Sequence, residues 1–458
     1  MMNARVMVEP PPILVISHEI IGAKMAGPGI RYYHLARVLA REFPVALAAP
    51  TGSVPVETNS IVPAMLVYAS GQDAALEKAI GEARAILVPA VVFAQIPALA
   101  RTDAPLIIDG YDPFLAETLE LTAETATQQA ALTQAYLAGD FFICASERQR
   151  DWWLGVLEAL GRVNAQTYTE DNSLRTLVDL VPFGLPESRP QHTHQMVKGI
   201  IPGIGENDRV VLWGGGLWQW LDPLTAIRAI SKIAEQRQDV RLFFPGTQHP
   251  NPGMAGLATH YATALDLANQ LGLLNRFVFF GDWVSYDDWQ NVLLESDVAL
   301  TLHMNDTLES RLAFRSRVLD YLWASVPVVA TRGDATSEWI AANDIGLLVD
   351  GQDVDGVARA IVRLLDTPRA TFAEKFRVIH QTMTWERAAL PLIEFCRRPR
   401  RAPDKVTLGD RLGNPYYVQQ IARLQSENAR LRNLVDAYEQ RRVVRWLNRV
   451  VEFKKRLD

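Results

Sequence analysis

Cysteine is scarce in this chain. Cys144 and Cys396 are the only two in 458 residues, which excludes a disulfide framework and is typical of a reducing compartment. Long apolar runs are also missing. The most apolar stretch, residues 85–100, is interrupted by two prolines and a glutamine, and a membrane-spanning helix needs roughly 20 residues. The first residues lack the apolar core of a signal peptide, so we expect a cytoplasmic protein.

Charge is modest overall but unevenly distributed. The net charge is −6, yet from Arg397 onwards 16 Lys and Arg stand against 7 Asp and Glu, whereas the preceding residues carry 30 against 45. An acidic body therefore carries a basic C-terminal segment, which favours an anionic membrane or an acidic partner. Nucleic acid is not an expected partner, because the acidic body opposes phosphate and no reader motif is present.

The first part of the chain reads as a series of βα units. Residues 13–17 form an apolar run of strand length, residues 22–29 form a glycine-rich loop, and residues 30–40 have helical periodicity. This order opens a doubly wound α/β domain, in which Gly27 and Gly29 lie close to the helix start that can bind an anion. The alternative for these glycines is a tight turn that serves only packing.

The same pattern restarts about 200 residues later. Residues 210–213 form a strand, Gly214, Gly215 and Gly216 follow it, and Pro223 is placed to begin the next helix. The repeat predicts two facing Rossmann-like domains. We expect an N-terminal domain at 1–190, a C-terminal domain at 205–385, a crossover helix at 386–400 and a helical tail at 414–458.

Residues 309–331, ESRLAFRSRVLDYLWASVPVVAT, combine a charged loop, an amphipathic helix and a buried strand. Arg317 and Asp320 are three residues apart and therefore share one side of the helix. A guanidinium group binds phosphate oxygens, and a carboxylate accepts hydrogen bonds from vicinal hydroxyls. The stretch predicts a site for a ligand with phosphates and sugar hydroxyls. The alternative is an ordinary amphipathic helix with a surface ion pair.

This stretch resembles the donor-binding segment of family 4 glycosyltransferases, which have the GT-B fold. There, an acidic loop residue precedes a helix of the form (K/R)xxE-Y-L/M-A-x-G-x-P-V-V, which is similar to Arg317 to Val329 here. Three features depart from the pattern: ten residues instead of seven separate the acids Glu309 and Asp320, the second acid is Asp, and Ser325 replaces Gly. The likeness extends over about residues 13–396.

The resemblance implies an α/β protein that transfers a sugar from a nucleotide-sugar donor, with retention, to a glycan or lipid-linked acceptor in cell-surface polysaccharide biosynthesis. It implies no cofactor. No divalent-metal motif of the Asp-x-Asp kind is recognised in the sequence, so we expect no metal ion. By resemblance Asp320 holds the ribose, Arg315 and Arg317 neutralise the diphosphate, and Glu309 contacts the sugar ring. Asp112, after an expected strand, either lines the acceptor side or caps the next helix. The expected residues are Glu309 and Arg317 as catalytic groups, Gly214, Gly215, Gly216, Val284, Arg315, Arg317 and Asp320 for the donor, and Gly27, Gly29, Arg31 and Asp112 on the phosphate and acceptor side.

One departure keeps two other functions open. Many relatives place an Arg and a Lys after the first strand of the donor domain, and residues 214–222 contain neither. A nucleotide-sugar epimerase of the same fold is the first alternative. A catalytically degenerate GT-B scaffold is the second.

The tail has two patterns. Apolar positions in residues 417–440 follow a heptad spacing with a single Asn428 among them, which predicts a parallel homodimer or, alternatively, an intramolecular helix. Residues 441–458 place valines, Trp446 and leucines along one side of a basic helix. That side predicts peripheral binding to the anionic inner face of the cell membrane. The alternatives for it are a solvated helix or more coiled coil.

Overall fold

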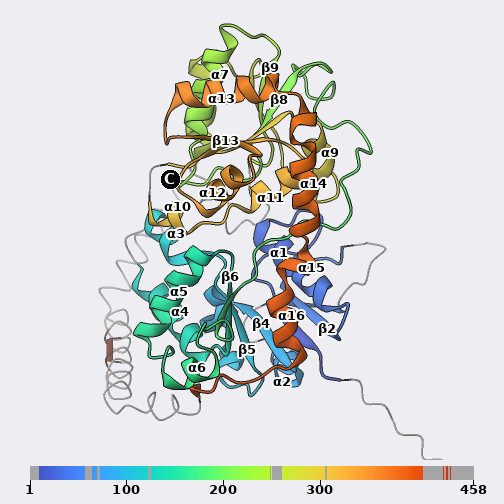
Figure 1. Ribbon diagram of the computed structural model, residues 1–458. Helices are drawn as coiled ribbons and strands as arrows, with labels where there is room; N and C mark the ends of the chain where they lie inside the picture. Colours follow the sequence, from blue (N-terminus) through green and yellow to red (C-terminus); the bar gives the residue numbers. More distant parts are fainter. Residues whose placement is uncertain are drawn as a thin grey trace, which may run out of the picture. The chain divides into compact units, whose positions relative to one another are not determined.

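The computed structural model describes residues 10–56, 64–69, 73–121, 125–247, 249, 260–304 and 307–405, together with 427, 430, 431 and 434. The chain divides into two units, residues 1–402 and 403–458. The first unit contains two parallel β-sheets, each flanked by helices (Figure 1).

The first sheet has seven strands in the order β3-β2-β1-β4-β5-β6-β7. Its strands are Ile13–Ile16 (β1), Val45–Pro50 (β2), Ala64–Tyr68 (β3), Ala85–Pro89 (β4), Leu106–Asp109 (β5), Phe141–Cys144 (β6) and Val178–Leu180 (β7). The helices between them are Gly27–Leu39 (α1), Ala74–Glu82 (α2), Ala90–Gln95 (η1), Pro97–Ala100 (η2), Phe114–Leu121 (α3), Ala126–Ala138 (α4), Glu147–Ala159 (α5) and Ala165–Glu170 (α6).

The second sheet has six strands in the order β10-β9-β8-β11-β12-β13. Its strands are Arg209–Leu212 (β8), Val240–Phe244 (β9), Val278–Phe280 (β10), Val298–Thr301 (β11), Val328–Thr331 (β12) and Gly346–Val349 (β13). The helices are Pro223–Ala234 (α7), His260–Gln270 (α8), Trp289–Leu294 (α9), Leu308–Leu312 (α10), Ser316–Trp323 (α11), Ala335–Ala342 (α12), Val354–Asp366 (α13), Arg369–Phe372 (η4), Ala373–Thr382 (α14), Trp385–Ala388 (α15) and Leu390–Arg397 (α16).

Continuous apolar runs form the central strands because both faces of each sheet are covered by helices. In β1 all four residues are buried, and alternate side chains enter different cores. Ile13 and Val15 join the core that continues into the second half, whereas Leu14 and Ile16 join the core on the other face of the sheet. The pairing of β1 with β2 and β4 is parallel, as the strand-loop-helix pattern predicts.

Two predicted helix or loop boundaries differ from those in the structure, in each case because of a residue near the start of a helix. Helix α1 begins at Gly27 rather than at Ile30, because Pro28 suits a first helical turn and its fixed φ begins the helix early. Glu309, expected in a loop, lies in the short helix α10, because Thr307 caps that helix and accepts a hydrogen bond from the Ser310 N–H.

The end of the first unit returns to the first sheet. Phe395 of α16 stacks on Phe141 of β6 with ring centroids 4.8 Å apart. Trp385 of α15 stacks on His34 of α1, with centroids 4.9 Å apart and an angle of 4° between the rings. These contacts fix the helices that follow the second domain against the first domain.

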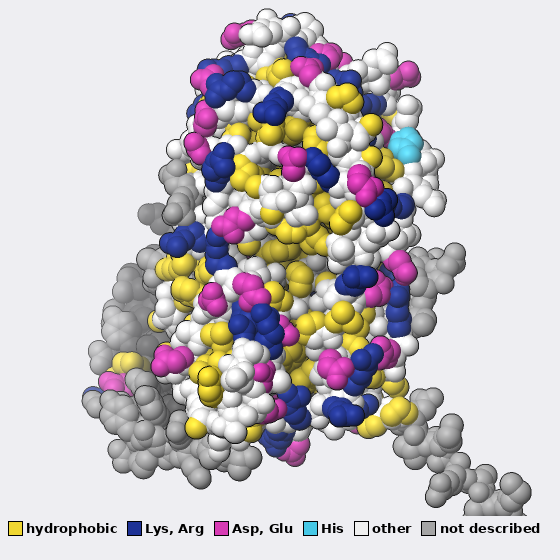
Figure 2. Space-filling view, in the orientation of Figure 1, with side chains coloured by type: hydrophobic (Ala, Val, Ile, Leu, Met, Phe, Trp, Pro, Cys, Tyr) yellow, Lys and Arg dark blue, Asp and Glu magenta, His cyan; other side chains and the backbone are white. Residues whose placement is uncertain are grey.

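Charged side chains of both signs are interspersed over the face of the molecule in Figure 2, with no large area of one sign. Among the residues that the structure describes, no helix combines the length and the apolar character needed to cross a lipid bilayer. The predicted dimer segment 417–440 and the basic segment 441–458 lie outside the described residues, apart from 427, 430, 431 and 434, which are helical.

Candidate functional site

The candidate site lies where loops at the carboxyl ends of both sheets meet, which is where open α/β sheets bind ligands. The Tyr111 hydroxyl, after β5, donates a hydrogen bond to the Phe314 carbonyl, before α11, over 2.7 Å. The Tyr286 N–H, after β10, donates to the Ala23 carbonyl, after β1, over 2.6 Å. These bonds hold the two halves of the site together.

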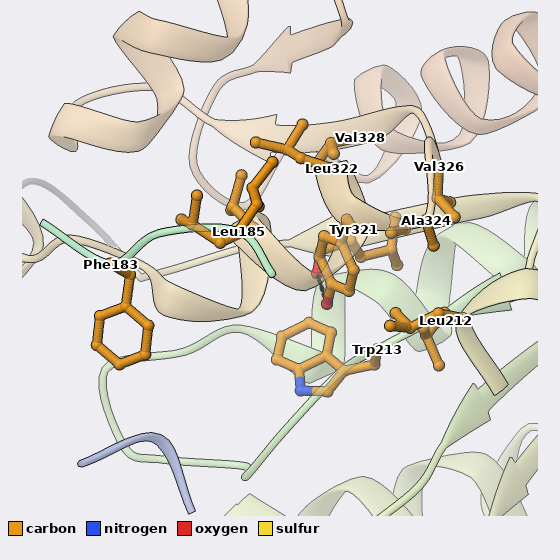
Figure 3. Packing of buried hydrophobic residues seen from close by; sticks show 14 of the residues in the cluster. Phe183, Leu185, Leu212, Trp213, Tyr321, Leu322, Ala324, Val326 and Val328 are labelled. Carbon is orange, nitrogen blue, oxygen red and sulfur yellow. Dashed lines mark hydrogen bonds between the residues drawn. The ribbon is translucent and has the colours of Figure 1, made fainter. Parts of the chain in front are cut away.

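The loop Gly214–Gly216 follows β8 and is held by a side chain of α11. The Gly214 N–H donates to the Tyr321 hydroxyl over 2.8 Å, and that hydroxyl donates to the Leu300 carbonyl over 3.0 Å. Tyr321 lies beside Trp213 in the buried cluster of Figure 3. Only glycine fits here, since a Cβ on Gly214 would lie 2.9 Å from the Tyr321 hydroxyl and Gly215 has φ +87°. Tyr321 therefore sets the position of the loop.

Arg317, in the first turn of α11, reaches this loop. Its Nη2 donates to the Gly216 carbonyl over 3.3 Å, and its guanidinium carbon lies 5.7 Å from the centre of the Trp213 ring. Its Nη1 is buried and has no hydrogen-bond partner among the described residues. Burial lowers the pKa of Arg317 to about 10, so the group is charged at neutral pH. An unpartnered guanidinium N–H beside a glycine loop is suited to an anionic ligand.

Asp320 lies one turn further along α11. The Trp289 indole N–H donates to its Oδ2 over 3.0 Å. Its Oδ1 accepts no hydrogen bond from any residue that the structure describes, and so remains available to a ligand. Burial raises the pKa of Asp320 to about 7, although Trp289 and Arg317 oppose that shift. A small environmental change can therefore switch its charge near neutral pH.

Glu309 and Arg315, predicted as separate site residues, are paired with each other. Arg315 Nη1 and Nη2 donate to the two carboxylate oxygens of Glu309 over 2.6 and 2.8 Å. Glu309 is fully buried, and Arg315 is 7% exposed. Arg315 Nε also lies 3.4 Å from Asp334, whose side chain caps α12. Although burial opposes the charge, Glu309 holds the pKa of Arg315 above its ordinary value.

This pairing does not match two sequence expectations. Both oxygens of Glu309 accept hydrogen bonds from Arg315 and its side chain is fully buried, so the carboxylate of the predicted sugar contact is not exposed in this conformation. Arg315 is neutralised by Glu309 and is not a free cation for a diphosphate. Residues six apart in the sequence reach each other here because the chain turns between α10 and α11, which local periodicity does not reveal. Arg317 is left as the cation beside the glycine loop.

Arg31 is held on the other side of the site. Its Nε and Nη2 donate to Asp109 over 2.7 and 3.1 Å, and the Tyr32 hydroxyl donates to the same carboxylate over 3.1 Å. The guanidinium carbon lies 4.7 Å from the centre of the Tyr111 ring. Arg31 Nη1 is buried without a hydrogen-bond partner among the described residues. Asp112 is half-buried nearby, and burial, with a contribution from Asp109, raises its pKa to about 7.

The remaining predicted residues shape the site by their size or position. A Cβ on Gly29 would lie 2.7 Å from the Ile20 carbonyl, and one on Gly27 would lie 3.4 Å from Ser316 Oγ. Gly29 therefore serves close packing of the first turn of α1, whereas Gly27 faces α11. Val284, after β10, is partly buried against the main core.

Several partners of these residues were not identified from the sequence. Asp109 lies 78 residues from Arg31, Trp289 lies 31 residues from Asp320, and Asp334 lies 19 residues from Arg315. The only local signals were positions at strand or helix ends, which many residues share. Tyr321 stands next to Asp320 in the quoted motif, but its bond to Gly214 spans 107 residues.

The described residues of the site do not include a cluster of side chains that could bind a metal ion. No group of three or more His, Cys, Asp or Glu within the described part of the chain could hold a metal ion. The sequence does contain one Asp-x-Asp segment, at Asp353 and Asp355. Asp353 caps α13 through the Gly356 N–H, and Asp355 forms an ion pair with Lys232. Both carboxylates therefore have structural partners.

The match to a protein family covers the second domain. Residues 208–367 match the model of the family described as Glycosyl transferases group 1. The curated D-inositol 3-phosphate glycosyltransferase of Corynebacterium urealyticum is 27% identical over 207 residues, which make up 44% of this chain and 46% of that protein. The match thus spans less than half the length of this relative.

Solved structures resemble most of the chain. Sucrose-phosphate synthase from Thermosynechococcus elongatus has a TM-score of 0.60 at 15% identity, covering 84% of this chain and 98% of its own. The E. coli trehalose-6-phosphate structure bound with UDP-2-fluoro glucose has a TM-score of 0.61 at 12% identity, covering 85% and 100%. Anabaena HepE in complex with UDP and glucose has a TM-score of 0.59 at 16% identity, covering 84% and 99%. The predicted GT-B fold of two facing Rossmann-like domains is confirmed.

Proposed function

We propose that the protein is a glycosyltransferase, because residues 208–367 match the model of the family Glycosyl transferases group 1. It moves a sugar from a nucleotide-sugar donor to a hydroxyl group of an acceptor. Two proteins of similar fold were solved with UDP or UDP-2-fluoro glucose, which makes uridine diphosphate sugars the first donors to test.

One observation carries the proposal. Arg317 places a buried, unpartnered Nη1 beside the Gly214–Gly216 loop, and Asp320 stands three residues further along the same helix. This arrangement offers a cation and backbone N–H groups to a diphosphate, and a carboxylate to the ribose hydroxyls. A helix that only packed against the sheet would not need an unpartnered buried guanidinium nitrogen.

We assign the donor to the second domain. Asp320 accepts hydrogen bonds from the ribose, and Arg317 neutralises the diphosphate as the bond between the sugar and the phosphate oxygen breaks. Charge that develops on a leaving group in a dry site is stabilised most by donors already held in place. Val284, four residues after β10, faces the base. The buried pair of Glu309 and Arg315 fixes the segment before α11.

The acceptor belongs to the first domain in this proposal. Gly27, Gly29, Arg31 and Asp112 shape that side. The family resemblance extends the proposal to transfer with retention and without a metal ion, onto a glycan or lipid-linked acceptor in cell-surface polysaccharide biosynthesis. The basic segment 441–458 would bring the protein to an anionic membrane, and residues 417–440 would form a homodimer.

Nucleotide binding tests the proposal directly. A ligand that binds only the folded state raises the melting temperature. The melting temperatures of wild type, Asp320→Ala and Asp266→Ala are therefore measured with UDP, GDP, ADP, CMP and dTDP. Asp266 is exposed on α8 of the same domain and serves as the matched control. We expect one nucleotide to stabilise wild type and Asp266→Ala, and to lose its effect in Asp320→Ala.

The other outcomes separate the alternatives. No stabilisation by any nucleotide would favour the degenerate scaffold. Binding followed by conversion of the nucleotide sugar to its isomer, without an acceptor, would favour the epimerase. Release of nucleoside diphosphate with transfer of the sugar supports the glycosyltransferase.

A further inference from the structure

His18 is a titratable side chain at the site that has no assigned role. It lies two residues after β1, in the segment between that strand and α1. His18 therefore follows the carboxyl end of β1. In the sheet, β1 lies between β2 and β4. Its ring is half-buried and lies edge-on to the Tyr32 ring, with centroids 5.9 Å apart.

Neither ring nitrogen of His18 has a hydrogen-bond partner among the described residues, and Nδ1 is buried. Most buried polar atoms in proteins are hydrogen-bonded. His34, by contrast, is fixed by a 2.6 Å hydrogen bond between its Nε2 and the Tyr286 hydroxyl. The structure therefore gives His18 the capacity to bind a group that the protein itself does not supply.

The groups around His18 decide which ligand suits it. Asp109 is bound by Arg31 and Tyr32, Asp112 stands on the loop after β5, and Glu19 is the next residue in the chain. Burial lowers the pKa of His18 to about 4, against the opposing attraction of Asp109. The ring is therefore neutral at pH 7, and a neutral imidazole nitrogen accepts a hydrogen bond from a hydroxyl.

The same surroundings disfavour a charged acceptor. A phosphate ester brings negative charge towards Asp109, which interacts electrostatically with His18 and is already compensated by Arg31, and towards Asp112, whose carboxyl interacts with Asp109. Like charges at short range disfavour binding. An uncharged polyol brings only hydroxyls, and Arg31 Nη1 is a further unpartnered donor for one of their oxygens.

We propose that His18 accepts a hydrogen bond from the hydroxyl that receives the sugar, and that the acceptor is an uncharged polyol or sugar at this position. The proposal rests on the proposed glycosyltransferase activity. It concerns binding and orientation of the hydroxyl, so His18 is a substrate-contacting residue on the acceptor side. The second domain holds the donor independently of it.

The test uses full-length His18→Ala, His18→Asn and His18→Gln, with His194→Ala as control. His194 is about half exposed, in the segment that joins the two domains. The Asn and Gln side chains keep a hydrogen-bond acceptor near the positions of Nδ1 and Nε2. The nucleotide that stabilises the wild type is identified first by its melting shift, and release of nucleoside diphosphate from the matching nucleotide sugar is then measured. Release is compared in water alone, with free hexoses, and with their 6-phosphates.

We expect every variant to keep the nucleotide melting shift. His18→Ala should release nucleoside diphosphate about tenfold more slowly, which corresponds to the loss of one neutral hydrogen bond. Either Asn or Gln should restore part of the rate, which a residue needed only for packing would not show. Free hexoses should accelerate release by wild type more than their phosphates do.

Three results would overturn the inference while leaving the proposed function intact: unchanged release by His18→Ala, a weaker nucleotide shift in that variant, or preference for the phosphorylated sugars. In the measurement with water alone, water itself accepts the sugar. The effect of His18 on release of nucleoside diphosphate is therefore measured even if the protein uses none of the hexoses as acceptors. A wild type that binds no nucleotide, or binds one without releasing it from its sugar, contradicts the proposed function instead.

Discussion

Tyr321 and Gly214 tie the helix of the site to its glycine loop, since the Gly214 N–H donates to the Tyr321 hydroxyl over 2.8 Å. The same hydroxyl donates to Leu300 at the end of β11. One side chain therefore joins β8, α11 and β11, and α11 also carries Arg317 and Asp320. The position of the cation and the carboxylate relative to the glycine loop depends on this bond.

Tyr321→Phe is expected to loosen the loop. It leaves the buried N–H of Gly214 and the carbonyl of Leu300 without their partner, which should lower the free energy of unfolding by about 1–3 kcal/mol. Nucleotide binding should weaken as well, because the loop is less well fixed. Denaturant unfolding and the nucleotide melting shift measure the two effects. Tyr168→Phe, at an exposed position of α6, should change neither, and an unaffected nucleotide shift in Tyr321→Phe would contradict the role of the bond.

Glu309 and Arg315 should behave as a buried unit. Glu309→Gln leaves the buried charge of Arg315 with Asp334, 3.4 Å from its Nε, as its remaining acidic partner, and Arg315→Met leaves Glu309 without its guanidinium partner. Each change should destabilise the fold by about 3–5 kcal/mol. The double variant should cost clearly less than the sum of the two, because neither charge then remains, and a double-mutant cycle from denaturant unfolding measures the difference. Additive losses would indicate that Glu309 acts outside this pair.

Arg317 is expected to recognise the diphosphate rather than the nucleoside. Arg317→Ala should weaken binding of the nucleoside diphosphate by about tenfold to a hundredfold, the effect of a charge-assisted hydrogen bond. Binding of the corresponding nucleoside should change little. Titration calorimetry of both ligands measures the difference. Arg228→Ala, on the exposed side of α7, is the control, and equal losses for both ligands would contradict the assignment.

Nucleotide affinity should depend on the protonation of Asp320. Its pKa is raised to about 7, and the ionised carboxylate is the form that accepts hydrogen bonds from the ribose. Affinity should therefore fall by up to about tenfold per pH unit below 7. Asp320→Asn should bind more weakly at pH 8 and lack this component. Protonation of the phosphate affects both proteins equally, so parallel pH profiles would rule out the role of Asp320.

The raised pKa of Asp320 also makes the stability of the fold depend on pH. The folded state holds the Asp320 proton more tightly than the unfolded chain, whose carboxyl has the ordinary pKa of 3.8. The stability that comes from this proton is fully present below pH 3.8 and is lost as the pH rises to about 7. Asp112 contributes with the same sign, so Asp320→Asn should flatten only part of the dependence.

Much of the fold follows from local sequence. Apolar runs such as Ile13–Ile16 have the length and composition of strands buried on both faces, and the two strand-glycine-helix starts indicate two doubly wound domains. Helical spacing alone places Arg317 and Asp320 on one side of α11. These features depend on neighbours within a few residues.

The tertiary structure decided which charged groups are available. Arg31 pairs with Asp109 and Gly214 with Tyr321 across 78 and 107 residues, and no local pattern encodes such partners. Glu309 and Arg315 look like two free site residues in the sequence but neutralise each other in the fold. Whether a charge faces a ligand or a protein partner depends on burial and on the partner's distance in space. The sequence by itself therefore determined the two domains and the helix of the site, and only the tertiary structure left Arg317, Asp320 and His18 with unpartnered atoms for a ligand.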